Sequence, residues 1–139
     1  MSIRIGITGA AGRMGRTLIE AISQVEGLAL AAAIERPEST LLGADAGELC
    51  GMGKNGVTVV SSLASVIGDI DVLIDFSVPA ATLDNLAHCV QSHVAIVIGT
   101  TGFTPEQQQV IEQAAGSIAI CKASNFSTGV NLCFKLLDM

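Results

Sequence analysis

Gly9-Ala10-Ala11-Gly12-Arg13-Met14-Gly15 is the stretch that decides the fold, because it joins a strand-like run to a helix-like segment. Ile3 to Thr8 before it is apolar, and after it apolar residues recur every three or four positions, as on one helix face (Met14, Leu18, Ile22, Val25). In such a turn Gly9 allows the tight bend, Gly12 lets a pyrophosphate approach the backbone, and Gly15 lets the helix pack closely on the sheet. The spacing is GxxGxxG and not the commoner GxGxxG. Its strand-turn-helix setting still favours a phosphate-binding turn over a tight turn without a ligand.

Strand-like and helix-like segments alternate along the whole chain. This alternation predicts an α/β fold, a Rossmann-like, doubly wound, mostly parallel sheet with helices on both faces. Two helix starts are marked, one by Ser77 and Pro79, the other by the capping box and proline of Thr104 to Gln107. Residues 36–56 have no clear period and contain five glycines, so they are predicted to form a long mobile loop. The predicted strands are Ile3 to Thr8, Leu28 to Ile34, Val57 to Val60, Val72 to Phe76, Ala95 to Ile98 and Ile118 to Ala123.

Composition narrows the class of protein. The 139 residues suffice for one domain, and with half of them apolar and 14% charged they fit a sheet covered on both faces. A net charge of −6, no Lys/Arg cluster and the absence of Trp and Tyr argue against a nucleic-acid partner. No apolar run has membrane-spanning length, and the first one is too short for a signal peptide, so the protein is expected to be cytoplasmic and not membrane-bound. The four cysteines form no CxxC pair, and no metal site is predicted.

The second predicted strand ends on a charged pair. Glu35 lies 20 residues beyond Gly15, where a dinucleotide-binding fold places the carboxylate that accepts the adenosine ribose hydroxyls. A carboxylate alone would repel a 2′-phosphate, and the guanidinium of the adjacent Arg36 can offset that repulsion. The pair therefore predicts binding of either NADH or NADPH; a solvated charge pair at a strand end is the alternative.

Three further strand ends carry small or hydroxylated residues, at Asp75-Phe76-Ser77, Gly99 to Phe103 and Ala123 to Ser127. Ligands of open α/β sheets bind beyond the carboxyl ends of the strands, so these segments are candidates to contact the nicotinamide half of the cofactor. Thr101 and Asn125 are the hydrogen-bonding candidates. The rest of the reaction chemistry is not apparent, since the chain has no tyrosine and no visible acid-base pair. No catalytic residue is predicted.

Taken together, the chain resembles the N-terminal part of the dihydrodipicolinate reductase family of the diaminopimelate and lysine pathway. The resemblance covers essentially the whole chain and rests on Gly12 to Gly15, Glu35-Arg36, Gly99 to Phe103 and Asn125 to Asn131. It implies that NADH or NADPH delivers a hydride to 4-hydroxy-tetrahydrodipicolinate, a small cyclic dicarboxylate. It also implies that Glu35 and Arg36 select the cofactor, that Gly9, Ala10, Ala11, Gly12, Arg13 and Met14 contact the phosphates, and that the nicotinamide is framed by Gly99, Thr100, Thr101, Ala123, Ser124, Asn125 and Phe126.

The resemblance also implies what lies elsewhere. Residues 1–127 would be the dinucleotide-binding domain and 128–139 the start of a substrate domain that is absent from this chain, together with the proton donor and the contacts of a homotetramer. This chain alone is expected to be inactive, and its own oligomeric state is left open. Val78 stands where family members commonly carry arginine, so no contact is carried over to it. Two alternatives remain: another NAD(P)-dependent dehydrogenase of amino-acid metabolism, and a non-catalytic dinucleotide-sensing module.

Overall fold

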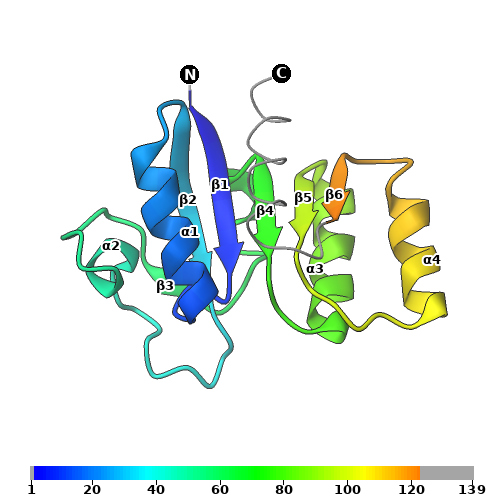
Figure 1. Ribbon diagram of the computed structural model, residues 1–139, viewed down its shortest axis with the longest axis horizontal. Coiled ribbons are helices and arrows are strands. Elements are labelled where there is room, and N and C mark those ends of the chain that lie inside the picture. Colours follow the sequence, from blue (N-terminus) through cyan, green and yellow to red (C-terminus); the bar gives the residue numbers. More distant parts are fainter. Residues whose placement is uncertain (1, 123–139) are drawn as a thin grey trace.

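A computed structural model describes residues 2–122 of the chain (Figure 1). Their strands form one six-stranded sheet in the order β3-β2-β1-β4-β5-β6, and every neighbouring pair of strands is parallel. The predicted α/β, doubly wound class is thereby confirmed. The strands are β1 (Ile3–Thr8), β2 (Leu28–Ile34), β3 (Val59–Val60), β4 (Val72–Asp75), β5 (Ala95–Ile98) and β6 (Ile120–Lys122). The helices are α1 (Arg13–Gln24), α2 (Ala46–Leu49), the 3-10 turn η1 (Ile67–Asp69), α3 (Pro79–Ser92) and α4 (Pro105–Ala114).

The strand order places a binding crevice at one edge of the sheet. The chain begins in the middle with β1, moves outward to β2 and β3, and then crosses to the other side of β1 for β4, β5 and β6. The strand order therefore reverses between the neighbours β1 and β4. The connection after β1 runs toward β2, and the connection after β4 runs the opposite way, toward β5. A crevice opens at such a point beyond the carboxyl ends of the strands. The glycine turn, residues 9–12, emerges there.

Two apolar cores cover the two faces of the sheet. On one face α1 buries Leu18, Ile19 and Ile22 in a cluster that also holds alternate residues of β1. On the other face α3 and α4 bury Leu86 and Ile111 in a second cluster with alternate residues of β4 and β5. Fully burying such a side chain contributes about 1.5–3 kcal/mol, so each helix is held mainly by its apolar stripe. The prediction of helices on both faces is confirmed.

The start of α4 agrees with the sequence-based prediction, whereas the start of α3 differs from it. Thr104 accepts the Gln107 N–H at 3.2 Å while the Gln107 side chain accepts the Thr104 N–H at 2.8 Å, which completes the predicted capping box of α4. Helix α3 starts at Pro79, but its N-cap is Val78 and the Ser77 hydroxyl does not cap it. That hydroxyl instead donates to the buried carboxylate of Asp75.

The loop after β2 is more ordered than the sequence predicts. Residues 46–49 form the short helix α2, and Asp45 at its N-cap accepts backbone N–H groups of Glu48, Asn55 and Gly56 at 2.9–3.1 Å. These hydrogen bonds lower the pKa of Asp45 below its usual value, and the bond from the Asn55 N–H has the largest effect. Four residues are too few to show a helical period, so one carboxylate organises a segment that composition alone presents as an irregular loop.

Candidate functional site

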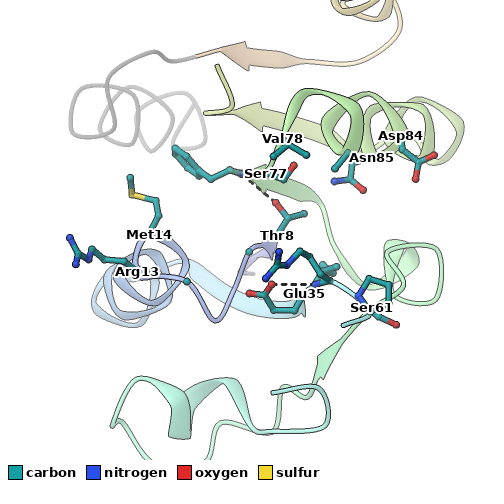
Figure 2. A pocket seen from close by; sticks show the side chains of 16 residues that line it. Thr8, Arg13, Met14, Glu35, Ser61, Ser77, Val78, Asp84 and Asn85 are labelled. Carbon is teal, nitrogen blue, oxygen red and sulfur yellow. Dashed lines mark hydrogen bonds between the residues drawn. The ribbon is translucent and has the colours of Figure 1, made fainter. Parts of the chain in front are cut away.

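A cleft of about 630 Å³ lies beyond the carboxyl ends of β2, β1 and β4 (Figure 2). Figure 2 shows Thr8 between Glu35 and Ser77, as the strand order β2-β1-β4 requires. The three strand ends and the N-terminal parts of α1 and α3 all contribute to its lining. Its lining residues are Thr8, Gly9, Gly12, Arg13, Met14, Ile34, Glu35, Arg36, Pro37, Ser61, Phe76, Ser77, Val78, Ala81, Asp84 and Asn85.

The three glycines of the turn differ in what the protein itself requires of them. Gly9 has φ +64°, a left-handed conformation that side chains rarely adopt. Gly15 is buried, and a Cβ there would lie 2.7 Å from the Cα of Ala10, so α1 could not approach β1. Gly12 has an ordinary extended conformation, with φ −75° and ψ 172°, and a Cβ there would meet one atom, the Gly9 carbonyl oxygen at 3.3 Å. Backbone strain does not demand glycine at position 12, which lines the cleft, and packing opposes a side chain there only through this one close contact.

The start of α1 presents backbone donors to the cleft. The first N–H groups of a helix have no partner within it, and the N-cap of α1 is Gly12, which has no side chain to supply one. The helix dipole adds positive potential at the same place. No acidic side chain lies in the first turn of α1 to use this potential. The arrangement suits an anionic group.

Glu35 is fixed beside this turn. One carboxylate oxygen accepts the Ala11 N–H at 2.9 Å and the other accepts the Arg36 N–H at 3.2 Å. The side chain is half-buried, while that of Arg36 is exposed. Each carboxylate oxygen keeps a free lone pair, so Glu35 can accept further hydrogen bonds from hydroxyl groups in the cleft.

A hydroxyl network forms the wall at β4. The buried Asp75 carboxylate accepts hydrogen bonds from Thr8 and Ser77, both at 2.6 Å. The backbone N–H of Ser77 donates to the Thr100 hydroxyl at 3.0 Å, and the Thr82 hydroxyl donates to the same atom at 2.8 Å. Thr82 and Thr100 are almost completely buried and do not line the cleft, whereas Thr8 and Ser77 both line it, and Ser77 is the more exposed of the two.

The structure brings one group of predicted site residues together and leaves a second group apart. Gly9, Gly12, Arg13, Met14, Glu35 and Arg36 line the cleft, with Ala10 and Ala11 inside the turn between them. Gly99, Thr100 and Thr101 do not line it. A Cβ on Gly99 would overlap the ring of Phe76, which packs against that backbone, and Thr100 turns its hydroxyl to the buried network. Ala123, Ser124, Asn125 and Phe126 lie outside the described residues, as does segment 128–139.

Several lining residues were not singled out from the sequence. Thr8 is a polar residue at the end of β1, directly after the apolar run Ile5 to Ile7, a signal that could have identified it. Ser61 directly follows β3 and so obeys the same strand-end rule as Glu35. Asp84 and Asn85 follow Ala81 at helical spacing on α3, and nothing in their local sequence distinguishes that face from a solvated one.

Two kinds of feature are absent from residues 2–122. No helix there has the length and apolar character needed to cross a membrane. No cluster of three or more His, Cys, Asp or Glu side chains there is arranged to hold a metal ion.

Comparison with known proteins identifies the family. A family model described as "Dihydrodipicolinate reductase, N-terminus" matches residues 3–126, which is most of the chain. This chain belongs to the dihydrodipicolinate reductase family. A curated relative, the 4-hydroxy-tetrahydrodipicolinate reductase of Saccharophagus degradans, is 55% identical over all 139 residues. The chain spans 52% of that relative's length, about half.

Solved structures support the same assignment. A dipicolinate-bound dihydrodipicolinate reductase from Paenisporosarcina sp. TG-14 matches with a TM-score of 0.73 and 31% identity, over 98% of this chain and 52% of the other. An aspartate semialdehyde dehydrogenase from Candida albicans, solved with NADP, matches at a TM-score of 0.63 and 16% identity, over 93% of this chain and 44% of the other. The second likeness is one of fold alone. It gives the alternative of a different amino-acid dehydrogenase no support beyond a shared architecture.

Proposed function

We propose that this chain is the dinucleotide-binding part of a 4-hydroxy-tetrahydrodipicolinate reductase and that its cleft takes NADH or NADPH. Family membership and the identity of 55% with a curated reductase support the assignment. Bound there, the nicotinamide would supply the hydride that reduces 4-hydroxy-tetrahydrodipicolinate in diaminopimelate and lysine biosynthesis. The residues of this chain bind and orient the cofactor.

The observation that carries the proposal is the exposed N-cap glycine of α1, Gly12, which lines the cleft. The fold requires glycine at position 9 for its φ and at position 15 for packing, whereas at position 12 it imposes one close contact, from a Cβ to the Gly9 carbonyl oxygen at 3.3 Å. A ligand phosphate resting on that backbone would meet any Cβ placed there. A bound phosphate would therefore add a second reason for glycine at position 12, beside the close Gly9 carbonyl oxygen.

The cofactor would lie across the three strand ends, with its adenosine ribose at β2, its pyrophosphate at β1 and its nicotinamide half at β4. Glu35 at the end of β2 accepts hydroxyls of the adenosine ribose, and the exposed guanidinium of Arg36 reaches a 2′-phosphate when one is present. The turn at β1 and the N-terminus of α1 hold the pyrophosphate through backbone N–H groups, with Arg13 and Met14 flanking it. The second ribose and the nicotinamide then reach the wall at β4, and residues 99–101 and 123–126 stay proposed contacts of the ring.

Substrate binding and protonation are assigned to the part of the relatives that this chain does not span. Reduction of a cyclic dicarboxylate requires positioned cationic and acid groups. The charged side chains that line the described cleft are Arg13, Glu35, Arg36 and Asp84, and two of these four are anionic. We place residues 1–127 in the cofactor domain and 128–139 at the start of a substrate domain, which also mediates assembly into a homotetramer.

Calorimetric titration with NADH and NADPH tests the proposal. Gly12→Val should abolish binding of both, because its side chain enters the phosphate space while its extended backbone suits a β-branched residue. Gly68→Val is the matched control, since a Cβ there meets nothing within 4 Å and the position lies outside the cleft. Absence of binding by the unmodified chain, or undiminished binding by folded Gly12→Val, would overturn the assignment.

A further inference from the structure

The peptide between Ala11 and Gly12 closes the glycine turn in front of α1. Its N–H donates to the Gly9 carbonyl oxygen at 3.0 Å, and its carbonyl oxygen accepts the Nε–H of the Arg16 side chain at 2.9 Å. In a planar trans peptide the N–H and the C=O point in opposite directions, so these two hydrogen bonds together fix which way the peptide faces. Arg16 is the side chain that holds its carbonyl end.

The backbone alone does not hold this peptide in one orientation. Rotating it would change the ψ of Ala11 and the φ of Gly12, and glycine adopts positive and negative φ about equally readily. A rotation that exchanges the two ends would bring the carbonyl oxygen to where the N–H now lies. Glycine at position 12 therefore leaves the orientation of the peptide to its hydrogen bonds.

Arg16 holds the carbonyl from outside the cleft. Its own backbone N–H donates to the Gly12 carbonyl oxygen at 3.0 Å, so its Cα is fixed in the first turn of α1. Side chains of a helix lean toward the helix N-terminus, which lets the Arg16 side chain reach back to Ala11. Arg16 is exposed, and neither Arg16 nor Ala11 is among the residues that line the cleft. The Ala11 carbonyl oxygen is thus kept out of the cleft lining.

This placement matters because the turn has few donors to spare. The Ala10 N–H donates to the Ile34 carbonyl oxygen at 3.2 Å and the Ala11 N–H donates to the Glu35 carboxylate at 2.9 Å, so the N–H groups of residues 10–12 are all bound within the protein. A phosphate then relies on the N–H groups in the first turn of α1, which have no partner within the helix. A carbonyl oxygen turned toward the same place would repel it.

We propose that Arg16 is a positioning residue of the phosphate-binding turn, whose guanidinium keeps the Ala11 carbonyl oxygen away from the pyrophosphate of the dinucleotide. The inference rests on the proposed function, which places a pyrophosphate at this turn. Arg16 acts through the backbone and does not touch the ligand. In this it differs from Arg13 and Arg36, whose side chains line the cleft.

Ligand affinity and the amide NMR spectrum, measured on the same variants, test the proposal. Arg16→Ala should bind ADP and NADH about threefold to tenfold more weakly, the factor that one hydrogen bond contributes. The amide resonance of Gly12 should shift in the same variant, because its nitrogen shares a peptide with the released carbonyl, while the amides of Leu18 and Ile19 in the core stay in place. Arg16→Lys, which keeps a cationic donor, should restore most of the affinity and of the Gly12 resonance.

Lys54→Gln is the matched control, because it also removes one positive charge from an exposed side chain outside the cleft. It should change neither the affinity nor the Gly12 resonance. Weaker binding by Arg16→Ala with an unchanged Gly12 resonance would overturn the proposal, since Arg16 would then act on the ligand directly. Unchanged binding by Arg16→Ala, or an equal loss in Lys54→Gln, would overturn it as well. Failure of the proposed function has a different signature, because the unmodified chain would then bind neither ligand.

Discussion

Glu35→Gln removes one negative charge from the cleft and preserves the shape of the side chain. The carboxylate is held beside the glycine turn by the N–H groups of Ala11 and Arg36, at 2.9 and 3.2 Å. A 2′-phosphate about 4 Å away would be repelled by about 1 kcal/mol in bulk water and by about 4 kcal/mol at an effective dielectric of 20. Because Glu35 is half-buried at the rim, the lower part of this range applies. NADPH should bind Glu35→Gln about tenfold more tightly, a change of about 1.4 kcal/mol.

NADH should respond in the opposite direction. Its ribose hydroxyls donate to a charged acceptor in the unmodified chain and to a neutral amide oxygen in Glu35→Gln, so its binding should weaken several-fold. Calorimetric titration with both cofactors gives the ratio of the two dissociation constants. Glu38→Gln is the control, an exposed carboxylate three residues along that does not line the cleft. Parallel changes for both cofactors, or the same change in ratio for Glu38→Gln, would refute the reasoning.

Three further variants probe the cofactor choice, the turn and the loop after β2. Arg36→Ala should weaken NADPH more than NADH in the same titrations, because only NADPH carries the phosphate that a guanidinium grips; equal losses would mean that Arg36 does not contact it. Gly15→Ala should lower the melting temperature, since overpacking against Ala10 costs about 1–3 kcal/mol and exceeds the gain of about 0.5–1 kcal/mol in helix propensity, whereas Gly68→Ala should not. Asp45 has a lowered pKa, so its contribution to stability is present above its ordinary value of 3.8 and is lost as pH falls through the lowered one. The stability difference between the unmodified chain and Asp45→Asn, followed by thermal melts from pH 7 to pH 2, should therefore shrink at the acid end; a difference independent of pH would contradict this.

The strands and the phosphate turn could be predicted because their signals are local. Each strand is predicted from a mainly apolar run bounded by turn residues, and the structure shortens some of the predicted ranges, for example from Val57–Val60 to Val59–Val60. Glu35 could be located because the carboxyl ends of parallel strands share one edge of the sheet, so spacing along the chain translates into position.

The rest of the site depends on side-chain packing, which local sequence does not encode. Gly99 follows a strand as the rule demands, yet the ring of Phe76 occupies the space in front of it. Asp75 and Ser77 belong to a quoted strand end, but their function as a hydroxyl network requires Thr8, 67 residues before Asp75 in the sequence. Helix α2 was missed for a related reason, because it depends on a single carboxylate that also binds residues ten positions away.

The central claim, that a dinucleotide binds across the ends of β2, β1 and β4, is tested most directly by amide NMR spectra of the chain during titration with NADH. The account predicts saturable shifts that are largest at residues 9–14, Glu35 and Ser77, with Gly68 and Gly116 unchanged. The absence of saturable shifts, or shifts concentrated on α4 and its flanking loops, would contradict it.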